Sequence, residues 1–253
     1  MTGSGDCRIM ERYMLVKGGY PYYGYKIGIL VLDSQIPRIP GDLGNATTYD
    51  FPVTYKVVRG ASIERVVNGT DPALLKPFID AAKELEAEGC KAITTSCGFL
   101  AIFQKELAAA VNIPVFTSSL IQVKFASMML SPCKKVGVIV SEPKNLSKRH
   151  LDGVGISDIP MVIKGVENSC FIRATHTDDP SFDPDLMREQ VVEAAKELVA
   201  SDPDVGAIVL ECTNLPPYAQ AVQRATGLPV FDIITLINYV HSTIVQKEYT
   251  GHM

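Results

Sequence analysis

Two cysteines occupy matching positions in the sequence and have the residue type and setting for chemistry. Cys97 ends the segment KAITTSC, Cys212 ends the segment GAIVLEC, and each segment is predicted to be a buried strand followed by a helix. Open α/β sheets bind their ligands at the carboxyl ends of the strands. The two thiols, 115 residues apart in the sequence, are therefore predicted to lie in a ligand site.

A pair of thiols on opposite walls of one cleft can invert a carbon centre. One thiolate removes the proton from the α-carbon of a small acid, and the opposite thiol returns a proton to the other face. The pKa of a free thiol is about 8.5, and neighbouring groups can move it toward neutrality. Hydrogen-bond donors must also stabilise the enediolate that forms. The candidate donors are Ser118, Thr213, Asn214 and the backbone after Cys97, which begins at Gly98.

The elements that position the cysteines recur along the chain. The segment KIGILV at 26–31 recurs as KVGVIV at 135–140, and the segment AAKEL at 81–85 recurs unchanged at 194–198. Likewise, IPVF before residue 117 recurs as LPVF before residue 232. Self-similarity at a fixed period indicates a duplicated structural unit. Each copy contributes one of the two cysteines at the same place.

The predicted fold is α/β, with two pseudo-symmetric Rossmann-like lobes and the active site in the cleft between them. The alternation of strands and helices requires parallel sheets with right-handed crossovers. We expect residues 1–128 together with 236–253 to form the first lobe and residues 129–235 to form the second.

Composition and charge exclude several functional classes. The net charge is −4 and acidic and basic residues are interspersed, so the sequence does not indicate the basic surface that a nucleic-acid-binding protein needs. No apolar run is long enough to span a membrane, and the charged N-terminal segment does not resemble a signal peptide, so a cytoplasmic protein is expected. The six cysteines form no CxxC pair, and we expect neither a metal nor a cofactor. Cys7, Cys90, Cys133 and Cys170 lack a repeat partner and are interpreted as structural.

The end of the first strand, which is predicted over Ile27–Leu32, supplies further candidates. Asp33 and Ser34 follow this strand directly, and a long loop containing Arg38 and Asn45 comes next. Loops at the carboxyl ends of strands often contact substrates, and Arg38 is a candidate partner for a substrate carboxylate. Thr117, after a strand of the first copy, is a further candidate contact.

Three more acid or base side chains are considered with these. Glu142 occupies the repeat position equivalent to Asp33. His176 lies in the polar stretch 168–183, which is predicted to be irregular and could close over the cleft. A site role and a structural role remain open for both residues. Glu211 is interpreted as structural, because strand alternation would point it away from Cys212.

These residues resemble the aspartate/glutamate/hydantoin racemase superfamily over residues 26–245. The turn after the first strand, with Asp33, is similar to the family's Asp–Ser turn, Cys97 to its first cysteine, and Cys212–Thr213 to its second motif. The resemblance implies cofactor-independent catalysis by Cys97 and Cys212, with Asp33 assisting a cysteine. It also implies that the final helix, predicted over 235–246, packs back on the first lobe. The sequence departs from that of glutamate racemases at two places: Gly98 and Phe99 replace Asn–Thr, and Asn214 replaces His. Both differences argue against glutamate as the substrate. Phe99 fits either a less polar ligand or a core role.

The leading hypothesis is a racemase or epimerase of a small amino acid or a related chiral carboxylic acid, working as a homo-oligomer. Within the same superfamily, a maleate-type cis–trans isomerase and an arylmalonate-type decarboxylase remain alternatives. A non-catalytic sensor of small acids is the alternative outside the enzymes. Exchange of the α-proton with solvent deuterium would distinguish them.

Overall fold

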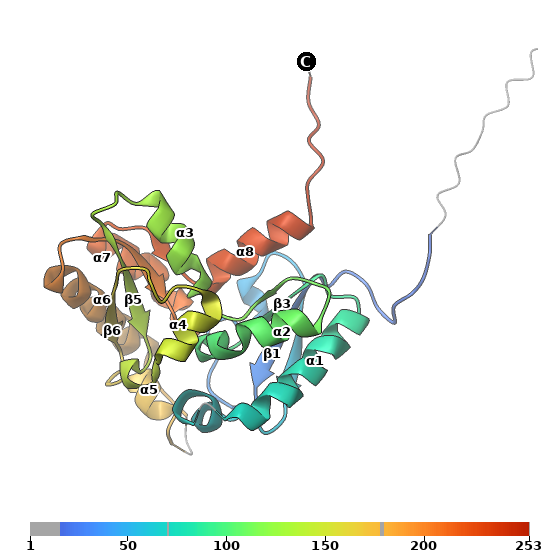
Figure 1. Cartoon of the computed structure of the whole chain (residues 1–253), viewed down its shortest axis with the longest axis horizontal. Helices are drawn as coiled ribbons and strands as arrows, with labels where there is room; N and C mark the ends of the chain where they lie inside the picture. The colour runs from blue at the N-terminus through green and yellow to red at the C-terminus, as the bar shows by residue number, and fades with distance from the viewer. Residues whose placement is uncertain (1–15, 70, 178–179, 253) are drawn as a thin grey trace, which may run out of the picture.

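The computed structural model describes residues 16–69, 71–177 and 180–252, and Cys7 lies outside these residues. Two four-stranded parallel sheets have the orders β2-β1-β3-β4 and β6-β5-β7-β8. Figure 1 shows the first sheet beside α1 and α2 and the second sheet beside α6 and α7. The two orders are the same when each strand is matched to its repeat partner. The predicted α/β fold with two similar parallel lobes is confirmed.

The strands coincide with the repeated apolar segments. The first sheet contains β1 (Ile27–Leu32), β2 (Val53–Val58), β3 (Ala92–Thr95) and β4 (Val115–Phe116), and the second contains β5 (Lys135–Val140), β6 (Met161–Gly165), β7 (Val205–Leu210) and β8 (Val230–Phe231). Gly28 and Gly137 are equivalent in the two copies, and a Cβ at either would lie 2.9 Å or 2.6 Å from a leucine of the covering helix. Both glycines therefore allow close helix-to-sheet packing.

The helices cover both faces of each sheet. They are α1 (Leu75–Ala87), α2 (Gln104–Ala110), α3 (Ile121–Met129), α4 (Lys148–Val154), α5 (Cys170–Ala174), α6 (Pro184–Ser201), α7 (Ala219–Thr226) and α8 (Ile233–Ile244). The start of α6 follows from local chemistry, because Pro184 occupies its first position and the Asp183 carboxylate accepts the backbone N–H of Asp185 at 2.9 Å.

Two helices cross between the lobes. Leu236 and Ile237 of α8 are buried with residues of β1, so the last helix packs on the first sheet. Val123 and Ala126 of α3 are buried with β5 and β7, so α3 packs on the second sheet. The helices meet, since the Gln122 side chain donates to the Asp232 carbonyl at 2.7 Å; Figure 1 shows them side by side. We propose that two such crossings join the lobes; the expected lobe boundaries remain a prediction.

Two segments differ from the local expectation. The helix predicted from residue 100 begins as a 3-10 helix, η4 (Gly98–Phe103), before α2. The stretch 168–183, predicted to be irregular, contains α5, because the Ser169 hydroxyl caps it by accepting the Ile172 N–H at 3.3 Å. Both differences fall beside the cleft, and each places a short helix against it.

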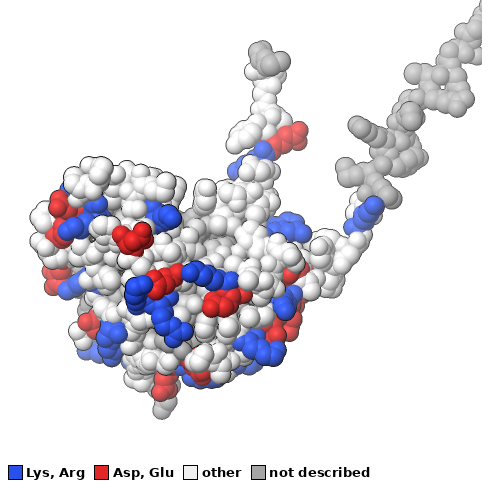
Figure 2. Space-filling view, viewed as in Figure 1, with Lys and Arg blue, Asp and Glu red and all other residues white. Residues whose placement is uncertain are grey.

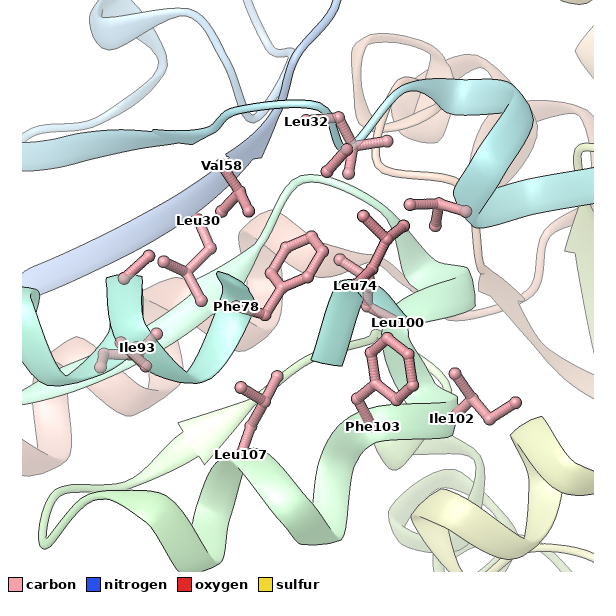
Figure 3. Packing of buried hydrophobic residues seen from close by; sticks show 14 of the residues in the cluster. Leu30, Leu32, Val58, Leu74, Phe78, Ile93, Leu100, Ile102, Phe103 and Leu107 are labelled. Carbon is pink, nitrogen blue, oxygen red and sulfur yellow. The ribbon is translucent and has the colours of Figure 1, made fainter. Parts of the chain in front are cut away.

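The packing of the first lobe is drawn in Figure 3. Phe78 of α1 is fully buried and lies over β1, with Leu30 nearby. Its ring centroid is 6.5 Å from that of Phe103, which lies at the end of η4. This core anchors the segment that follows Cys97.

The described surface agrees with the composition. The face in Figure 2 carries acidic and basic side chains interspersed. Among the described residues, no helix combines the length and apolar character needed to cross a membrane.

Candidate active site

A cavity lies between the two lobes and contains both repeat cysteines. It encloses about 50 Å³, which is room for a small ligand. The first lobe lines it with residues of β1, of the loop after β1, of η2 (Glu64–Asn68) and of the segment around Cys97; the second lobe adds the segments after β5 and β7 and the region of α5. The lining residues are Leu32, Ser34, Ile36, Arg38, Ile63, Val67, Ser96, Cys97, Gly98, Phe99, Ser141, Glu142, Phe171, Ile172, Thr175, His176, Glu211, Cys212, Thr213 and Asn214.

The two thiols are half-buried, and their surroundings keep them mostly protonated at neutral pH. Burial raises the pKa of Cys97 to about 12, and the nearby Glu211 carboxylate adds to the rise. The backbone N–H groups of Phe99 and Leu100 and the charge of Arg38 act in the opposite direction. Burial and then Glu211 also raise the pKa of Cys212 well above its ordinary value, against one backbone N–H from Asn214. Cys97 therefore has more groups that favour its thiolate.

Glu211 lines the cavity, contrary to the structural role interpreted from strand alternation. Strand β7 ends at Leu210, so the alternation of side chains does not extend to Glu211. Its side chain is fully buried, and neither carboxylate oxygen has a hydrogen-bond partner. Burial raises the pKa of this carboxyl to about 8, and the nearby backbone N–H of Ser141, which does not form a hydrogen bond with either oxygen, lowers it in part. A carboxyl group in this setting is largely protonated at neutral pH.

A chain of polar contacts joins Arg38 to the segment after Cys212. Arg38 Nη1 donates to Asp42 Oδ1 at 3.1 Å, and Asn214 Nδ2 donates to Asp42 Oδ2 at 2.6 Å. Asp42 is buried and holds a residue from each lobe beside the cavity. Sequence reasoning missed Asp42, although it lies in the loop selected for substrate contacts. Arg38, from the loop after β1, and Asn214, from the second lobe, therefore bind the same Asp42 carboxylate.

Asp33 does not line the cavity, although it was expected to assist a cysteine. Its carboxylate accepts Arg59 Nη1 at 3.2 Å and the Gly60 N–H at 3.0 Å. The next residue, Ser34, does line the cavity, and its buried hydroxyl has no hydrogen-bond partner. The chain turns after Leu32, so successive side chains point to different sides.

The repeat position equivalent to Asp33 does reach the cavity. Glu142 is buried there, and its Oε1 accepts His176 Nε2 at 2.8 Å. His176 follows α5, so a segment expected to be irregular closes one side of the cavity with Phe171, Ile172 and His176. Asn145 also contacts the Glu142 carboxylate. The repeat comparison was the signal that identified Glu142.

Three predicted substrate contacts serve the scaffold instead. The Asn45 amide donates to the Arg38 carbonyl at 2.9 Å, and its oxygen caps a short helix. The Thr117 hydroxyl donates to Gln104 at 2.9 Å, and the Ser118 oxygen accepts the Leu120 N–H at 3.2 Å. Asn45, Thr117 and Ser118 do not line the cavity. Asn45 still acts on the site indirectly, because it supports the backbone of Arg38.

The remaining predicted contacts lie at the cavity. Gly98 and Phe99 line it beside Cys97, and Phe99 also packs edge-on to the His150 ring at 5.3 Å between centroids. Thr213 and Asn214 line it beside Cys212. Among the described residues, no group of three His, Cys, Asp or Glu side chains is arranged to hold a metal ion.

A family model described as Asp/Glu/Hydantoin racemase matches residues 53–237. The chain belongs to this family. The match spans both cysteines and most of both sheets, so the resemblance inferred from the Cys97 and Cys212 motifs is confirmed. The chain is therefore an enzyme of the Asp/Glu racemase superfamily.

The curated relatives carry the name of a different reaction. The chain is 31% identical to a dimethylsulfoniopropionate lyase of Durusdinium sp. clade D, over 99% of this chain and 85% of the relative. It is 33% identical to dimethylsulfoniopropionate lyase 7 of Emiliania huxleyi, over 89% of this chain and 69% of the relative. Both relatives are named as lyases. The expected isomerase class is thus not shown for this family member.

Solved structures share the fold at low sequence identity. An arylmalonate decarboxylase superposes with a TM-score of 0.60 at 15% identity, covering 90% of this chain and 95% of that chain. The aspartate racemase of Picrophilus torridus superposes with a TM-score of 0.55 at 15% identity, covering 89% of this chain and 96% of that chain. These similarities establish the two-lobe racemase fold.

Proposed function

We propose that this protein is a lyase that removes the α-proton of dimethylsulfoniopropionate, or of a closely related small zwitterionic acid, and expels dimethyl sulfide. The observation that carries the proposal is that one cavity is lined by Cys97, Cys212 and Arg38. The buried side chains of Glu142 and Glu211 line the same cavity. The named activity of relatives at 31% and 33% identity supports this choice of substrate.

The reaction needs one base and one leaving group. A cysteine thiolate takes the proton from the carbon next to the carboxylate and becomes a thiol. The electron pair of the broken C–H bond forms the C=C bond, and the C–S bond breaks with its pair on sulfur. The products are acrylate and neutral dimethyl sulfide, and the thiol must return one proton to solvent before the next cycle. A racemase shares the first of these steps.

Cys97 is the better candidate for the base. The Phe99 and Leu100 N–H groups and Arg38 all favour its thiolate, whereas the Cys212 thiolate is favoured by the Asn214 N–H. The cationic sulfonium of a bound substrate would favour the Cys97 thiolate further. Cys212 then serves as a protonated group on the opposite wall.

The cavity offers a partner for each part of a sulfonium carboxylate. Arg38 is the cation available to the carboxylate. The buried Glu142 carboxylate and the aromatic faces of Phe99 and Phe171 suit a methylated cation. Apolar side chains such as Leu32 and Ile172 complete a wall against which methyl groups pack.

The two walls of the cavity differ in chemistry. Ser96 stands before Cys97, where the second copy has Glu211; Gly98 corresponds to Thr213. Each difference changes the hydrogen bonds and charge around one thiol. Elimination needs a base on one face only, so this asymmetry favours a lyase.

Racemisation of a chiral carboxylic acid is the second candidate. It is favoured by one observation, the presence of a thiol from each lobe in the same cavity. Inversion requires a base on one face and an acid on the other, which this placement supplies. The two candidates differ in whether the α-carbanion loses a β-substituent or regains a proton.

Proton NMR in deuterium oxide distinguishes the two candidates. With dimethylsulfoniopropionate, a lyase produces the vinyl signals of acrylate together with dimethyl sulfide. With each enantiomer of aspartate, glutamate and related acids, a racemase replaces the α-proton by deuterium and inverts the centre. Exchange and inversion without any acrylate would overturn the lyase proposal in favour of the racemase. The Cys97→Ala variant, assayed in the same way, controls for background elimination.

A further inference from the structure

Glu211 is a buried acid at the cavity to which neither the family resemblance nor the proposed reaction assigns a role. It is 0% exposed and lines the cavity, yet neither Oε1 nor Oε2 has a hydrogen-bond partner. A buried polar group without a hydrogen bond is destabilising, and such groups are rare in native proteins. A ligand in the cavity is the partner that this carboxyl lacks.

The fold makes room for this side chain between the two cysteines. Glu211 immediately precedes Cys212, and it packs from the second lobe onto Gly98, the residue after Cys97. A Cβ at Gly98 would lie 2.2 Å from Glu211 Oε1 and 2.5 Å from the Glu211 carbonyl oxygen. Any other residue at position 98 would therefore displace the carboxyl group. Gly98 was predicted to contact the substrate, and the close approach of Glu211 also requires a glycine at this position.

The charges around Glu211 favour its neutral form during the reaction. A bound carboxylate and a thiolate add negative charge to a cavity that Glu142 also lines, and Arg38 is shared with Asp42. An ionised Glu211 would add a further negative charge, and it raises the pKa of both thiols. The ionisable groups that face it or line the same cavity are Cys97, Cys212, Arg38, Asp42, Glu142 and His176.

We propose that Glu211 works as a neutral carboxylic acid, whose O–H donates a hydrogen bond to the substrate carboxylate as that group gains negative charge on loss of the α-proton. This role rests on the proposed α-proton abstraction and deepens it. Removing a proton next to a carboxylate builds up charge on the carboxylate oxygens, and a preorganised donor stabilises that charge in a site from which water is excluded. A carboxyl kept neutral by an apolar site performs this task in other enzymes.

The proposal predicts an alkaline limit to activity. The pKa of Glu211 is raised to about 8 by burial. Above that pH the carboxyl loses the donated proton, and its charge further opposes thiolate formation. Activity should therefore fall as pH rises through this value, although thiolate formation alone would make activity rise.

Two substitutions separate a neutral donor from a carboxylate base. Glu211→Gln keeps an N–H donor of similar shape that does not titrate, whereas Glu211→Leu removes the donor. We expect Glu211→Gln to retain activity within about tenfold and to lose the alkaline fall, and Glu211→Leu to lose about 10²–10³-fold in kcat. Equal loss in both variants would overturn the neutral-donor role and indicate a carboxylate base. Wild-type kinetics and pH dependence in Glu211→Leu would overturn any role.

A measurement without substrate keeps this test independent of the proposed function. Alkylation of Cys97 and Cys212 by iodoacetamide, followed by mass spectrometry across pH 7 to 10, reports thiolate formation. Both Glu211 variants should be alkylated faster than the wild type above pH 8, because a nearby negative charge is gone. Asp33→Asn, which removes a carboxylate that does not line the cavity, should leave the alkylation profile unchanged. If the Glu211 variants shift the pH profile of alkylation but the wild type acts on no acid, the proposed lyase function alone is wrong. If the alkylation profile is unshifted in both Glu211 variants, the placement of Glu211 beside the thiols is overturned.

Discussion

Thr213 Oγ1 donates a 2.7 Å hydrogen bond to the backbone carbonyl of Ser96, so the residue after one cysteine holds the residue before the other. Both residues are buried, and the bond crosses between the two lobes. The Ser96 hydroxyl in turn accepts the Leu32 N–H at 2.9 Å, which ties the same point to the end of β1. The distance between the thiols therefore depends on contacts that neither lobe makes alone.

Replacing Thr213 by Val should destabilise the protein and impair catalysis together. The substitution keeps the shape but leaves the buried Ser96 carbonyl unpaired, which costs about 1–3 kcal/mol. Urea denaturation measures the loss, and kcat/KM should fall because the two walls are no longer held in register. Thr243→Val is the matched control, since the exposed Thr243 hydroxyl bonds within its own helix. Equal effects of both variants would show that the cross-lobe bond is unimportant.

The two cysteines should differ in their contribution. Under the lyase proposal, Cys97→Ala removes the base and should lower kcat by about 10²–10⁴-fold. Cys212→Ala should cost less, because elimination needs no proton donor on the second face. Cys133→Ala is the control, since this thiol is exposed and lies outside the cavity. Equal and complete loss in both cavity variants would overturn the assignment of Cys97 as the single base and show that elimination needs both thiols. The assay is acrylate release under saturating substrate.

Asp42→Asn should weaken substrate binding although Asp42 itself does not line the cavity. The change removes the negative charge that holds Arg38 and replaces one acceptor oxygen by a donor facing Arg38 or Asn214. We expect KM to rise about tenfold or more, with a smaller change in kcat. Asp33→Asn is the matched control, because its ion pair with Arg59 lies away from the cavity and exposed ion pairs contribute little. A large loss of activity in Asp33→Asn would restore the assisting role that the family resemblance implied.

The stability of the protein should decrease as pH rises between about 5 and 8. The carboxyl of Glu211 has its pKa raised from 4.5 to about 8, so between these values it is protonated in the folded state and ionised in the unfolded state. The folded state then binds more protons, and the free energy of unfolding falls by about 1.4 kcal/mol per pH unit from this group.

Urea denaturation of the wild type and of Glu211→Gln at pH 5.5 and pH 7.5 measures this dependence. The contribution from Glu211 is absent in the Gln variant, so the difference in stability between the two proteins should change with pH. A constant difference at both pH values would mean that Glu211 ionises normally in the folded protein.

Local pattern and internal repetition were enough to predict the scaffold. The first strand was predicted over Ile27–Leu32 and has these bounds, because a run of apolar residues ended by Asp and Ser has few alternatives. The repeat placed Cys97 and Cys212 at equivalent strand ends, and both line one cavity. These properties depend on residues close together in the sequence, or on comparing one copy with the other.

Only the tertiary structure decided which polar side chains face the thiols. Asp33 and Glu142 are equivalent in the repeat, yet Glu142 lines the cavity and Asp33 pairs with Arg59. Asp42 and Asn214 meet across 172 positions of the chain, a contact that no spacing indicates. Glu211 follows the last residue of its strand, so its direction is set by packing against the other lobe rather than by strand alternation. The sequence determined the two lobes and their thiols, and the contact between the lobes decided the chemical environment of those thiols.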